Sequence, residues 1–298
     1  MENKRVIAGV SGGPDSMYLL NKLYNEGYKV IVCHINHGFR KESDEEYEMV
    51  KSFCNERNIT FEGLIVKDTD WDKYKHLKNK QSMARELRYD FYIELADKYN
   101  TKDIYIGHHK DDWLETAIMQ QNRSDEYLYF GIEDKSNYKG YIINRPLLSM
   151  YKLGIIKYND KNNIPYRIDK SNSEPIYDRN KVRISLNNKT EEEKDILIEQ
   201  YNSINKSKEE IKFKTIESYH EWKRRNFSYD FYINIDEEVK RYVIYRFLIK
   251  YKERINISSD KIDGIIDFLK EKKGDKGYRL TENLRIGVRN SIIFVYEQ

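Results

Sequence analysis

The fold is decided near the N-terminus by the stretch Arg5-Val6-Ile7-Ala8-Gly9-Val10-Ser11-Gly12-Gly13-Pro14-Asp15-Ser16. Residues 4–10 predict a buried strand, and residues 16–25 predict an amphipathic helix. The two glycines between them let backbone amides approach a phosphate with no Cβ in the way, and the helix supplies unpaired N–H groups at the positive end of its dipole. Pro14 suits a first helical turn. The turn predicts a phosphate site made of Ser11, Gly12, Gly13, Pro14, Asp15 and Ser16.

Strand and helix patterns alternate through the first two-thirds of the chain. Further strands are expected at residues 28–35, 59–66 and 102–107, with extended segments at 141–148 and 165–168. Further helices are expected at residues 43–57, capped by Ser43, and at 82–99 and 111–121. Strands that alternate with helices indicate an α/β fold, in which a Rossmann-like parallel sheet is covered by helices on both faces.

The pattern becomes mainly helical after about residue 186. Helices are expected at 190–202, 209–225, 237–251 and 259–272, followed by a β-hairpin with strands at 278–284 and 289–296. We predict a catalytic domain at residues 1–200 and a smaller, mainly helical domain at 201–298. The second holds 21 Lys and Arg against 16 Asp and Glu, while the first holds 32 against 34. The basic excess suits a polyanion partner, and it equally suits an ordinary solvated surface.

Composition narrows the class of protein. The chain has 298 residues, of which 35% are charged and 39% hydrophobic, which is typical of a globular protein long enough for two domains. No apolar run approaches the roughly 18–20 residues of a membrane-spanning helix, and no secretory leader pattern precedes the first strand. Two cysteines cannot form a disulfide framework, so a cytoplasmic location is expected.

The phosphate turn lacks the Gly-Lys-Ser/Thr of a Walker loop and the third glycine of a dinucleotide fingerprint. It resembles the pyrophosphate loop of the ATP-pyrophosphatase superfamily, whose members cleave ATP between the α and β phosphates. Six further motifs follow in order. They are His34-Ile35-Asn36-His37-Gly38-Phe39-Arg40, Ala84-Arg85-Glu86-Leu87-Arg88-Tyr89, His108-His109-Lys110-Asp111-Asp112-Trp113-Leu114-Glu115-Thr116, Arg145-Pro146-Leu147-Leu148, Asp169-Lys170-Ser171-Asn172 and Arg179-Asn180-Lys181-Val182-Arg183.

This ordered set is similar to the tRNA(Ile)-lysidine synthetase family over residues 4–185, and the chain looks like a short form of it. The last third resembles the family in architecture alone. Two positions depart from the family pattern: Trp113 stands where members usually have glutamine, and residues 121–126 stand in place of an Arg-Gly-rich stretch. The second departure concerns the loop over the active site, whereas the ATP motifs are intact.

The resemblance implies a two-step ligation. The C2 oxygen of the wobble cytidine in the CAU anticodon of tRNA(Ile) attacks the α-phosphate of ATP, which releases pyrophosphate and leaves an adenylated base. The ε-amine of free L-lysine then attacks C2 and displaces AMP. The product, lysidine, switches the codon and amino-acid identity of the tRNA from Met to Ile. Mg²⁺ is the expected cofactor, and a homodimer is a possible assembly.

The same resemblance, together with residue chemistry, assigns roles. Asp15 is expected to orient Mg²⁺, while Asp112 and Glu115, one helical turn apart, hold and deprotonate the lysine ammonium. Arg88 is expected to contact phosphate as a catalytic and ATP-binding residue. The remaining expected ATP contacts are His37, His108 and His109. The expected tRNA contacts are Arg145, Arg179, Arg183, Lys223, Arg224 and Arg225.

Other interpretations stay open at this stage. The His-His-x-Asp-Asp cluster could hold zinc, although no cysteine or third well-spaced histidine completes such a site. A tRNA thiolase of the same superfamily would activate the base identically, but Cys33 and Cys54 do not form the Cys-x-x-Cys pair such chemistry often uses. A non-catalytic RNA-binding module is the alternative outside enzymology. The intact phosphate turn and acidic pair argue against it.

Overall fold

The computed structural model describes residues 4–38, 42–77, 79–123, 127–168, 178–251, 255, 257–271 and 277–297. The chain divides into two units. The first comprises Met1–Thr116 with Ile132–Glu191, and the second comprises Ala117–Gly131 with Glu192–Gln298. The expected boundary at residue 200 therefore falls inside a helix of the second unit, α7 (Glu191–Ser207).

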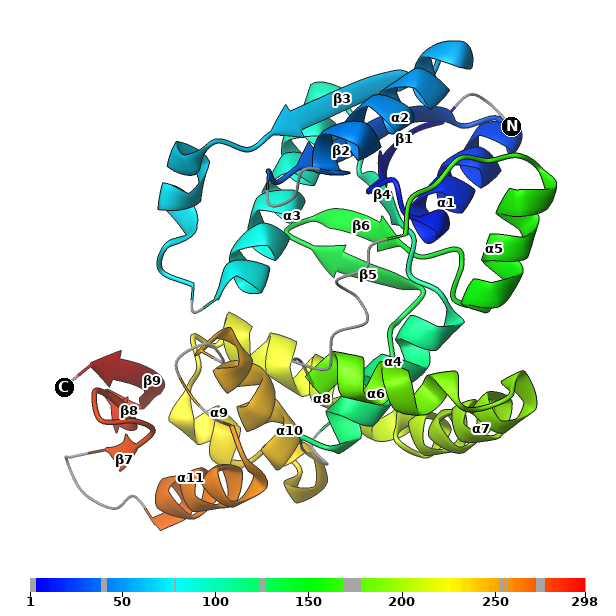
Figure 1. The fold of residues 1–298 in the computed structure, drawn as a ribbon. Coiled ribbons are helices and arrows are strands. Elements are labelled where there is room, and N and C mark those ends of the chain that lie inside the picture. Colours follow the sequence, from blue (N-terminus) through cyan, green and yellow to red (C-terminus); the bar gives the residue numbers. More distant parts are fainter. Residues whose placement is uncertain are drawn as a thin grey trace. The chain divides into compact units, whose positions relative to one another are not determined.

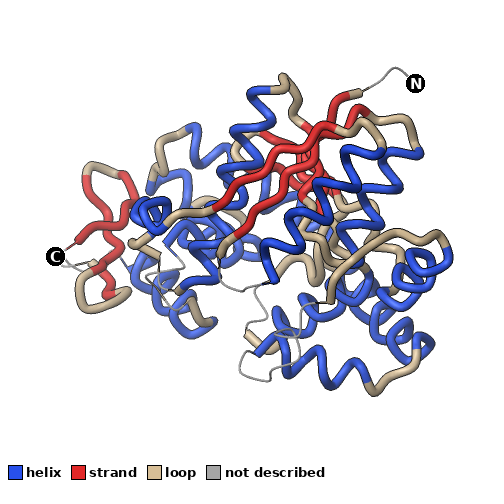
Figure 2. The backbone as a smooth tube through the Cα atoms, turned by 45° about the horizontal axis from the view of Figure 1, so that its top comes forward, coloured by secondary structure: helices blue, strands red, loops and turns tan. Residues whose placement is uncertain are grey.

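The first unit is built on a six-stranded sheet in the order β3-β2-β1-β4-β6-β5 (Figures 1 and 2). All neighbouring strands are parallel except β5, which pairs antiparallel with β6. This arrangement confirms the predicted Rossmann-like fold. The strands are β1 (Arg5–Gly9), β2 (Lys29–Asn36), β3 (Thr60–Ile65), β4 (Asp103–Ile106), β5 (Lys135–Tyr138) and β6 (Tyr141–Asn144).

Helices cover both faces of this sheet, as predicted, because successive strand residues point to opposite sides. Val6 and Ala8 of β1 join one core, into which α1 (Pro14–Asn25), α2 (Glu42–Glu56) and α5 (Lys152–Lys161) pack. Ile7 joins the other core, which is covered by α3 (Lys80–Lys98). The phosphate turn leads directly from β1 into α1. Its position is therefore fixed by the packing of β1 in both cores and of α1 in the first core.

Several element boundaries differ from those expected. Ser43 does not cap α2, which begins one residue earlier. Helix α3 begins at Lys80 because the Asn79 side chain accepts a hydrogen bond from the Ser82 backbone at 2.8 Å. The polar edge strand β5 was not predicted, and the segment 165–168 is not a strand. Four short helices among the described residues were also missed: α5, α6 (Asp178–Asn187), the 3₁₀ helix η1 (Asp68–Tyr74) and α9 (Tyr229–Ile233).

The second unit is mainly helical and ends in a three-stranded sheet, as predicted in outline. Its core gathers Trp222, Tyr232 and Phe247, all at most 1% exposed. After α7 come α8 (Glu209–Arg224), α9 (Tyr229–Ile233), α10 (Glu237–Leu248), η3 (Ile249–Tyr251), α11 (Ser259–Glu271), β7 (Tyr278–Arg279), β8 (Leu284–Arg289) and β9 (Ile292–Glu297).

The predicted C-terminal hairpin is confirmed, but its first strand lies later in the chain than expected. The hairpin joins β8 to β9, with Asn290 and Ser291 at its turn. Both turn residues have positive φ, 49° and 57°, as a type I′ turn requires, because this turn matches the right-handed twist of the paired strands. Of the expected strand 278–284, Tyr278 and Arg279 form β7, and Leu284 is the first residue of β8.

The segment after α4 (Lys110–Gln121) belongs to the second unit. The Asn205 side chain donates to the Phe130 carbonyl at 2.9 Å and accepts from the Phe130 amide at 2.7 Å. The Phe130 ring packs on Tyr201, with ring centroids 5.7 Å apart. Residues 127–131 are thus docked on α7. None of the described helices is long and apolar enough to cross a membrane.

Candidate active site

The phosphate turn lies at the carboxyl end of β1, between its neighbours β2 and β4. The strand order reverses at β1, because β2 and β3 lie on one side of it and β4 lies on the other. Open α/β sheets bind ligands at such a reversal point. A cleft of about 900 Å³ opens at this point in the first unit. Its walls include Ser11, Gly13, Pro14, Asp15, Ser16, His34, His37, Arg85, Arg88, His108, Lys152 and Arg167.

Hydrogen bonds within the phosphate turn hold it in a compact loop. Gly12 has φ of 89°, a conformation that favours glycine. The Ser16 hydroxyl donates to the Gly13 carbonyl at 2.9 Å and accepts from the Ser11 amide at 3.1 Å. Pro14 is the first residue of α1, as the sequence predicts. The structure therefore brings all six predicted turn residues together at one helix N-terminus.

Gly107, at the end of β4, packs against the backbone of the turn. A Cβ placed on it would lie 3.1 Å from the carbonyl carbon and oxygen of Asp15, and 3.3 Å from the Ser16 amide. The contact partners are backbone atoms, which cannot rotate away as a flexible side chain can. This close approach sets the distance between β4 and the phosphate turn.

Replacing Gly107 with alanine is expected to raise the KM for ATP about tenfold, because overpacking of about 1–3 kcal/mol would displace the turn. The KM is measured by tRNA-dependent pyrophosphate release. Gly154→Ala is a matched control, since nothing lies within 4 Å of a Cβ built there. An unchanged KM in Gly107→Ala would show that the turn tolerates the shift.

Two of the predicted histidines are uncharged at neutral pH. Burial lowers the pKa of His37 to about 4, helped by the positive charge of Arg88. Burial also lowers the pKa of His108 to about 4, with Arg145 and Arg179 adding to the effect. His37 stacks on Trp71, with ring centroids 5.9 Å apart. These neutral rings suit hydrogen bonding and stacking with a nucleotide more than charge neutralisation.

His109 sits at the centre of an acidic cluster. Its Nε2 atom lies 3.3 Å from Asp112 Oδ2 and 3.7 Å from Asp15 Oδ2, and its Nδ1 atom lies 3.5 Å from Asp111 Oδ2. Burial opposes its protonation, but the bond with Asp111 and the charges of Asp112 and Asp15 together raise its pKa. Burial raises the pKa of Asp15, against the attraction of His109 and Lys152. His109 therefore links three carboxylates beside the phosphate turn.

The predicted acidic pair on α4 meets two arginines of α6. Glu115 is 2% exposed, and its carboxylate accepts from Arg183 Nε at 2.7 Å, from Arg183 Nη2 at 3.0 Å and from Arg179 Nε at 2.9 Å. Arg179 Nη2 also donates to Asp112 Oδ1 at 3.2 Å. Burial favours the protonated form of Asp112, but His109, His108 and Arg179 together lower its pKa. Both carboxylates are thus paired with arginines of α6.

The other two predicted arginines of the first unit, Arg145 and Arg88, differ in their exposure. Arg145 is buried, and its guanidinium donates to the Glu133 carbonyl at 2.7 Å and to Ser136 Oγ at 2.9 Å. Arg88 lines the cleft and is exposed, and within the described ranges it makes no ion pair. Arg85 also lines the cleft, with its guanidinium 4.9 Å from the Tyr89 ring centre. Arg85 was quoted in a motif but not selected from the sequence as a site residue.

The predicted basic cluster Lys223-Arg224-Arg225 lies at the end of α8 in the second unit. All three residues are exposed. Arg224 Nη2 lies 2.6 Å from Glu221 Oε2, and Arg225 Nε lies 2.7 Å from Glu221 Oε1. Glu221 therefore offsets part of the positive charge that the sequence alone suggested.

The sequence did not point to α5, although this helix braces the phosphate turn. Its first residue, Lys152, places Nζ 3.8 Å from Asp15 Oδ2, and the buried Asn159 donates to the Pro14 carbonyl at 2.9 Å. Arg167, further along, donates its backbone amide to the Gly12 carbonyl at 2.9 Å. Neither the spacing nor the residue types of this segment mark these contacts, because their partners lie about 140 residues or more away in the chain.

Some predicted features lie outside the described residues: Phe39 and Arg40 of the second motif, residues 169–172, residues 124–126 and the lysines at 272 and 273. Trp113, the departure from the family pattern, is buried on α4. Across the part of the chain that the structure describes, no group of three His, Cys, Asp or Glu residues is arranged to hold a metal ion. The zinc alternative thus receives no support from these residues.

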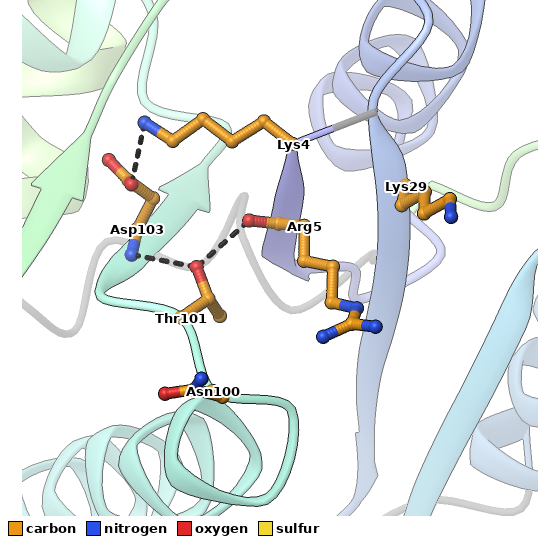
Figure 3. A pocket seen from close by; sticks show the side chains of 6 residues that line it. All are labelled: Lys4, Arg5, Lys29, Asn100, Thr101 and Asp103. Atoms are coloured by element: carbon orange, nitrogen blue, oxygen red, sulfur yellow. Dashed lines mark hydrogen bonds and ion pairs between the residues drawn. The ribbon is translucent and has the colours of Figure 1, made fainter. Parts of the chain in front are cut away.

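A second, smaller depression of about 400 Å³ lies at the opposite end of the strands. It is lined by Lys4, Arg5, Lys29, Asn100, Thr101 and Asp103 (Figure 3). Lys4 Nζ pairs with Asp103 Oδ2 at 2.7 Å, and the Thr101 hydroxyl donates to the Arg5 carbonyl at 2.8 Å. These contacts join the amino ends of β1 and β4. Parallel sheets bind ligands at their carboxyl ends, so this depression is not a candidate active site.

Comparison with known proteins identifies relatives of the whole chain. The chain matches the family model of the PP-loop domain over residues 1–190. It is 39% identical to the tRNA(Ile)-lysidine synthase of Ureaplasma parvum serovar 3, over 97% of this chain and 86% of that protein. It is 35% identical to the tRNA(Ile)-lysidine synthase of Malacoplasma penetrans and 33% identical to that of Mycoplasma genitalium. These alignments cover 98% of both chains and 97% of both chains, respectively.

Among solved structures, the chain resembles the U34-tRNA thiolase NcsA from Methanococcus maripaludis, determined with its [4Fe-4S] cluster. The TM-score is 0.55 at 18% sequence identity, and the match covers 70% of this chain and 73% of the thiolase. At this identity the likeness concerns the fold alone.

Proposed function

Because this chain belongs to the tRNA(Ile)-lysidine synthase family of PP-loop enzymes, we propose that it joins L-lysine to the C2 carbon of the wobble cytidine in the CAU anticodon of tRNA(Ile). The chain is an ATP-dependent ligase by the same membership. One observation supports the full reaction above all. The phosphate turn and the Asp112–Glu115 pair are linked through His109, which contacts Asp15 on one side and Asp112 on the other.

In the first step, the C2 oxygen of cytidine attacks the α-phosphate of ATP. A bond forms between that oxygen and phosphorus, the bond from phosphorus to the α–β bridging oxygen breaks, and pyrophosphate leaves. The amides of Asp15 and Ser16 in the first turn of α1, together with the helix dipole, favour binding of these phosphates at the turn. Arg88, exposed in the same cleft, supplies a cation for phosphate.

The turn also fits a divalent cation. Asp15 Oδ1 is buried and has no hydrogen-bond partner among the described residues, while Oδ2 faces His109 and Lys152. Mg²⁺ is commonly held by one or two carboxylates together with substrate phosphates and water, so one carboxylate is enough. Asp15 would hold the ion, which would polarise the phosphates when bound.

In the second step, the ε-amine of lysine attacks C2, the C2–oxygen bond to the adenylate breaks, and AMP leaves. The ammonium must first be bound and lose a proton, and Asp112 and Glu115 are the carboxylates proposed for both tasks. Arg179 and Arg183 already occupy these carboxylates. We infer that the lysine ammonium replaces one guanidinium, so the two arginines keep the buried carboxylates paired until the substrate arrives.

The tRNA is proposed to present a splayed anticodon base to the cleft, as in most sequence-specific RNA recognition. The basic C-terminal region, residues 201–298, is proposed to hold the tRNA through phosphates, with Lys223, Arg224 and Arg225 among the contacts. Their exposure at the end of α8 supports this role. Their partial neutralisation by Glu221 predicts a moderate rather than a dominant contribution.

Replacing Lys223, Arg224 and Arg225 together with glutamine is expected to weaken tRNA binding and lower the log–log salt slope by roughly 2, since the slope follows the number of phosphates neutralised. Filter binding across a salt series measures both quantities. Lys214→Gln is the control, because Lys214 lies on the same helix but outside the Lys223-Arg224-Arg225 cluster. An unchanged slope in the triple variant would reject this docking role.

The full reaction is tested by incorporating labelled lysine into purified tRNA(Ile) and tRNA(Met) that share the CAU anticodon. We expect ATP-dependent incorporation into the first and little into the second. Sulfur incorporation would instead favour a thiolase. Burial raises the pKa of Cys54 to about 12 and also raises the pKa of Cys33, so neither thiol is poised as a thiolate nucleophile. Lack of any tRNA-dependent pyrophosphate release would point to a non-catalytic module.

A further inference from the structure

The phosphate turn has no cation of its own. Residues 11–16 contain two serines, two glycines, one proline and one aspartate. Pyrophosphate is a multiply charged anion, and its departure is favoured by positive charge placed where negative charge develops. Among the residues that the structure describes, the lysines and arginines that line the cleft are Arg85, Arg88, Lys152 and Arg167. These four are the candidates to serve the leaving group.

Contacts distinguish Lys152 from the other three cations. Its Nζ atom lies 3.8 Å from Asp15 Oδ2, inside the phosphate turn. Arg167 directs its guanidinium away to Glu45, with Nη2 3.2 Å from Oε2. Arg85 rests on the Tyr89 ring, and Arg88 makes no described ion pair with the turn. Lys152 is therefore the described cleft cation that contacts the turn through its side chain.

The fold fixes the backbone of Lys152 but leaves its ammonium group free to move. The Lys152 amide donates to Asp111 Oδ2 at 2.9 Å, and two residues earlier the Met150 carbonyl accepts from the Lys110 amide at 2.8 Å. Seven residues further along α5, the fully buried Asn159 binds the Pro14 carbonyl. Helix α5 is thus tied to the start of α4 and to the phosphate turn, whereas 43% of the Lys152 side chain is exposed.

Packing between the helices makes this attachment rigid. Figure 1 shows α5 beside α1, and Tyr18 of α1 meets Tyr158 of α5 with ring centroids 4.9 Å apart. Ile155 is fully buried in the core that α1 shares. Because α1 begins at the phosphate turn, the distance from Lys152 to the turn is set by helix packing rather than by a loop.

We propose that Lys152 binds the departing pyrophosphate and acts as a catalytic residue for cleavage of ATP between its α and β phosphates. This inference rests on the proposed function of the cleft. Before ATP binds, Asp15 holds the ammonium; with ATP present, the ammonium turns to the β and γ phosphates. As the bond from α-phosphorus to the bridging oxygen breaks, its electron pair stays on pyrophosphate. The three N–H donors of Lys152 then meet that added charge.

The test compares Lys152→Gln, Lys152→Arg and a control on the same helix, Lys157→Gln. Lys157 is exposed and does not line the cleft. Lys152→Gln is expected to slow tRNA-dependent pyrophosphate release about 10²-fold, the usual effect of removing one donor from a developing charge. The inhibition constant of added pyrophosphate should rise about tenfold or more in the same variant. Lys152→Arg should recover part of both losses, and Lys157→Gln should match the wild type.

Two measurements separate this role from a structural one. Thermal melting of Lys152→Gln should match the wild type, because the hydrogen bond from its amide to Asp111 does not involve the side chain. Calorimetric titration with pyrophosphate alone should show weaker binding by Lys152→Gln, even in an Asp15→Asn background. If Lys152→Gln no longer weakens pyrophosphate binding in the Asp15→Asn background, Lys152 acts only by neutralising Asp15, and the proposal is overturned.

The outcomes also separate this inference from the proposed function. If wild-type protein releases no pyrophosphate with tRNA(Ile) and ATP, the proposed reaction itself fails. If the wild type is active and Lys152→Gln behaves like Lys157→Gln in both rate and pyrophosphate inhibition, the proposed reaction stands and the role of Lys152 is rejected.

Discussion

Replacing Asp15 with alanine is expected to reduce tRNA-dependent pyrophosphate release by about 10³-fold, at the upper end of the effect of one electrostatic group. The structure gives the reason. The Asp15 carboxylate faces His109 and Lys152 through one oxygen, and its other oxygen is buried without a described partner. Removing it takes away the proposed metal ligand and leaves His109 and Lys152 without this contact. Pyrophosphate release from ATP in the presence of tRNA(Ile) is the measurement.

A matched control separates chemistry from folding. Asp103→Asn alters a carboxylate at the opposite, amino end of the same sheet, where it pairs with Lys4 (Figure 3). Its ion pair is largely exposed on the lysine side, so little stability is expected to depend on it. The Asp15 variant should still bind tRNA in a filter assay. Near-normal pyrophosphate release by Asp15→Ala would remove Asp15 from the mechanism.

Glu115→Gln is expected to slow lysine transfer about 10³-fold, within the usual range for loss of a general base, and to slow adenylation much less. A neutral amide cannot accept the proton of the ammonium and binds it less well. Adenylated tRNA should therefore accumulate when lysine is supplied. Single-turnover experiments with ATP labelled in the α-phosphate measure the two steps separately.

The same variant is also expected to destabilise the first unit by about 3 kcal/mol, because it leaves Arg179 and Arg183 without the buried carboxylate they share. The arginines are 39% and 26% exposed, so water can replace part of the lost contact. Arg183→Gln is the matched variant. If Glu115 serves only to hold α6, then Arg183→Gln should reproduce both the transfer defect and the lower melting temperature. An equal loss of adenylation and transfer in Glu115→Gln would make Glu115 a structural residue.

Local interactions explain why the phosphate turn was predictable from the sequence. The two glycines, Pro14 at the first helical position and the flanking strand and helix patterns all act over a short stretch of chain. The carboxyl ends of parallel strands meet at one edge of a sheet, so motifs that follow β1, β2 and β4 in the sequence should gather there. The cleft lining, with Asp15, His37 and His108 together, agrees with that expectation.

Pairings between distant residues were decided only by the tertiary structure. Arg179 and Arg183 both bind Glu115, from which they are separated by 64 and 68 positions in the chain. An arginine that suits phosphate by its chemistry suits a carboxylate equally well, so residue type could not choose between these partners. Lys152 was not identified from the sequence for the same reason, because its partner Asp15 lies on another helix, distant in the chain.

In the C-terminal hairpin, the sequence determined that strands form, whereas the tertiary structure determined how they pair. Apolar residues alternate before Asn290 and run continuously from Ile292 to Tyr296 after it, so the sequence by itself determined that two strands would form near the end of the chain. Their register depends on which residues adopt positive φ at the turn and on which side chains reach the core around Phe247 and Ile286. Those choices come from packing across the second unit. The apolar pattern along the strands cannot specify them, because a continuous apolar run such as residues 292–296 offers apolar side chains to either face in any register.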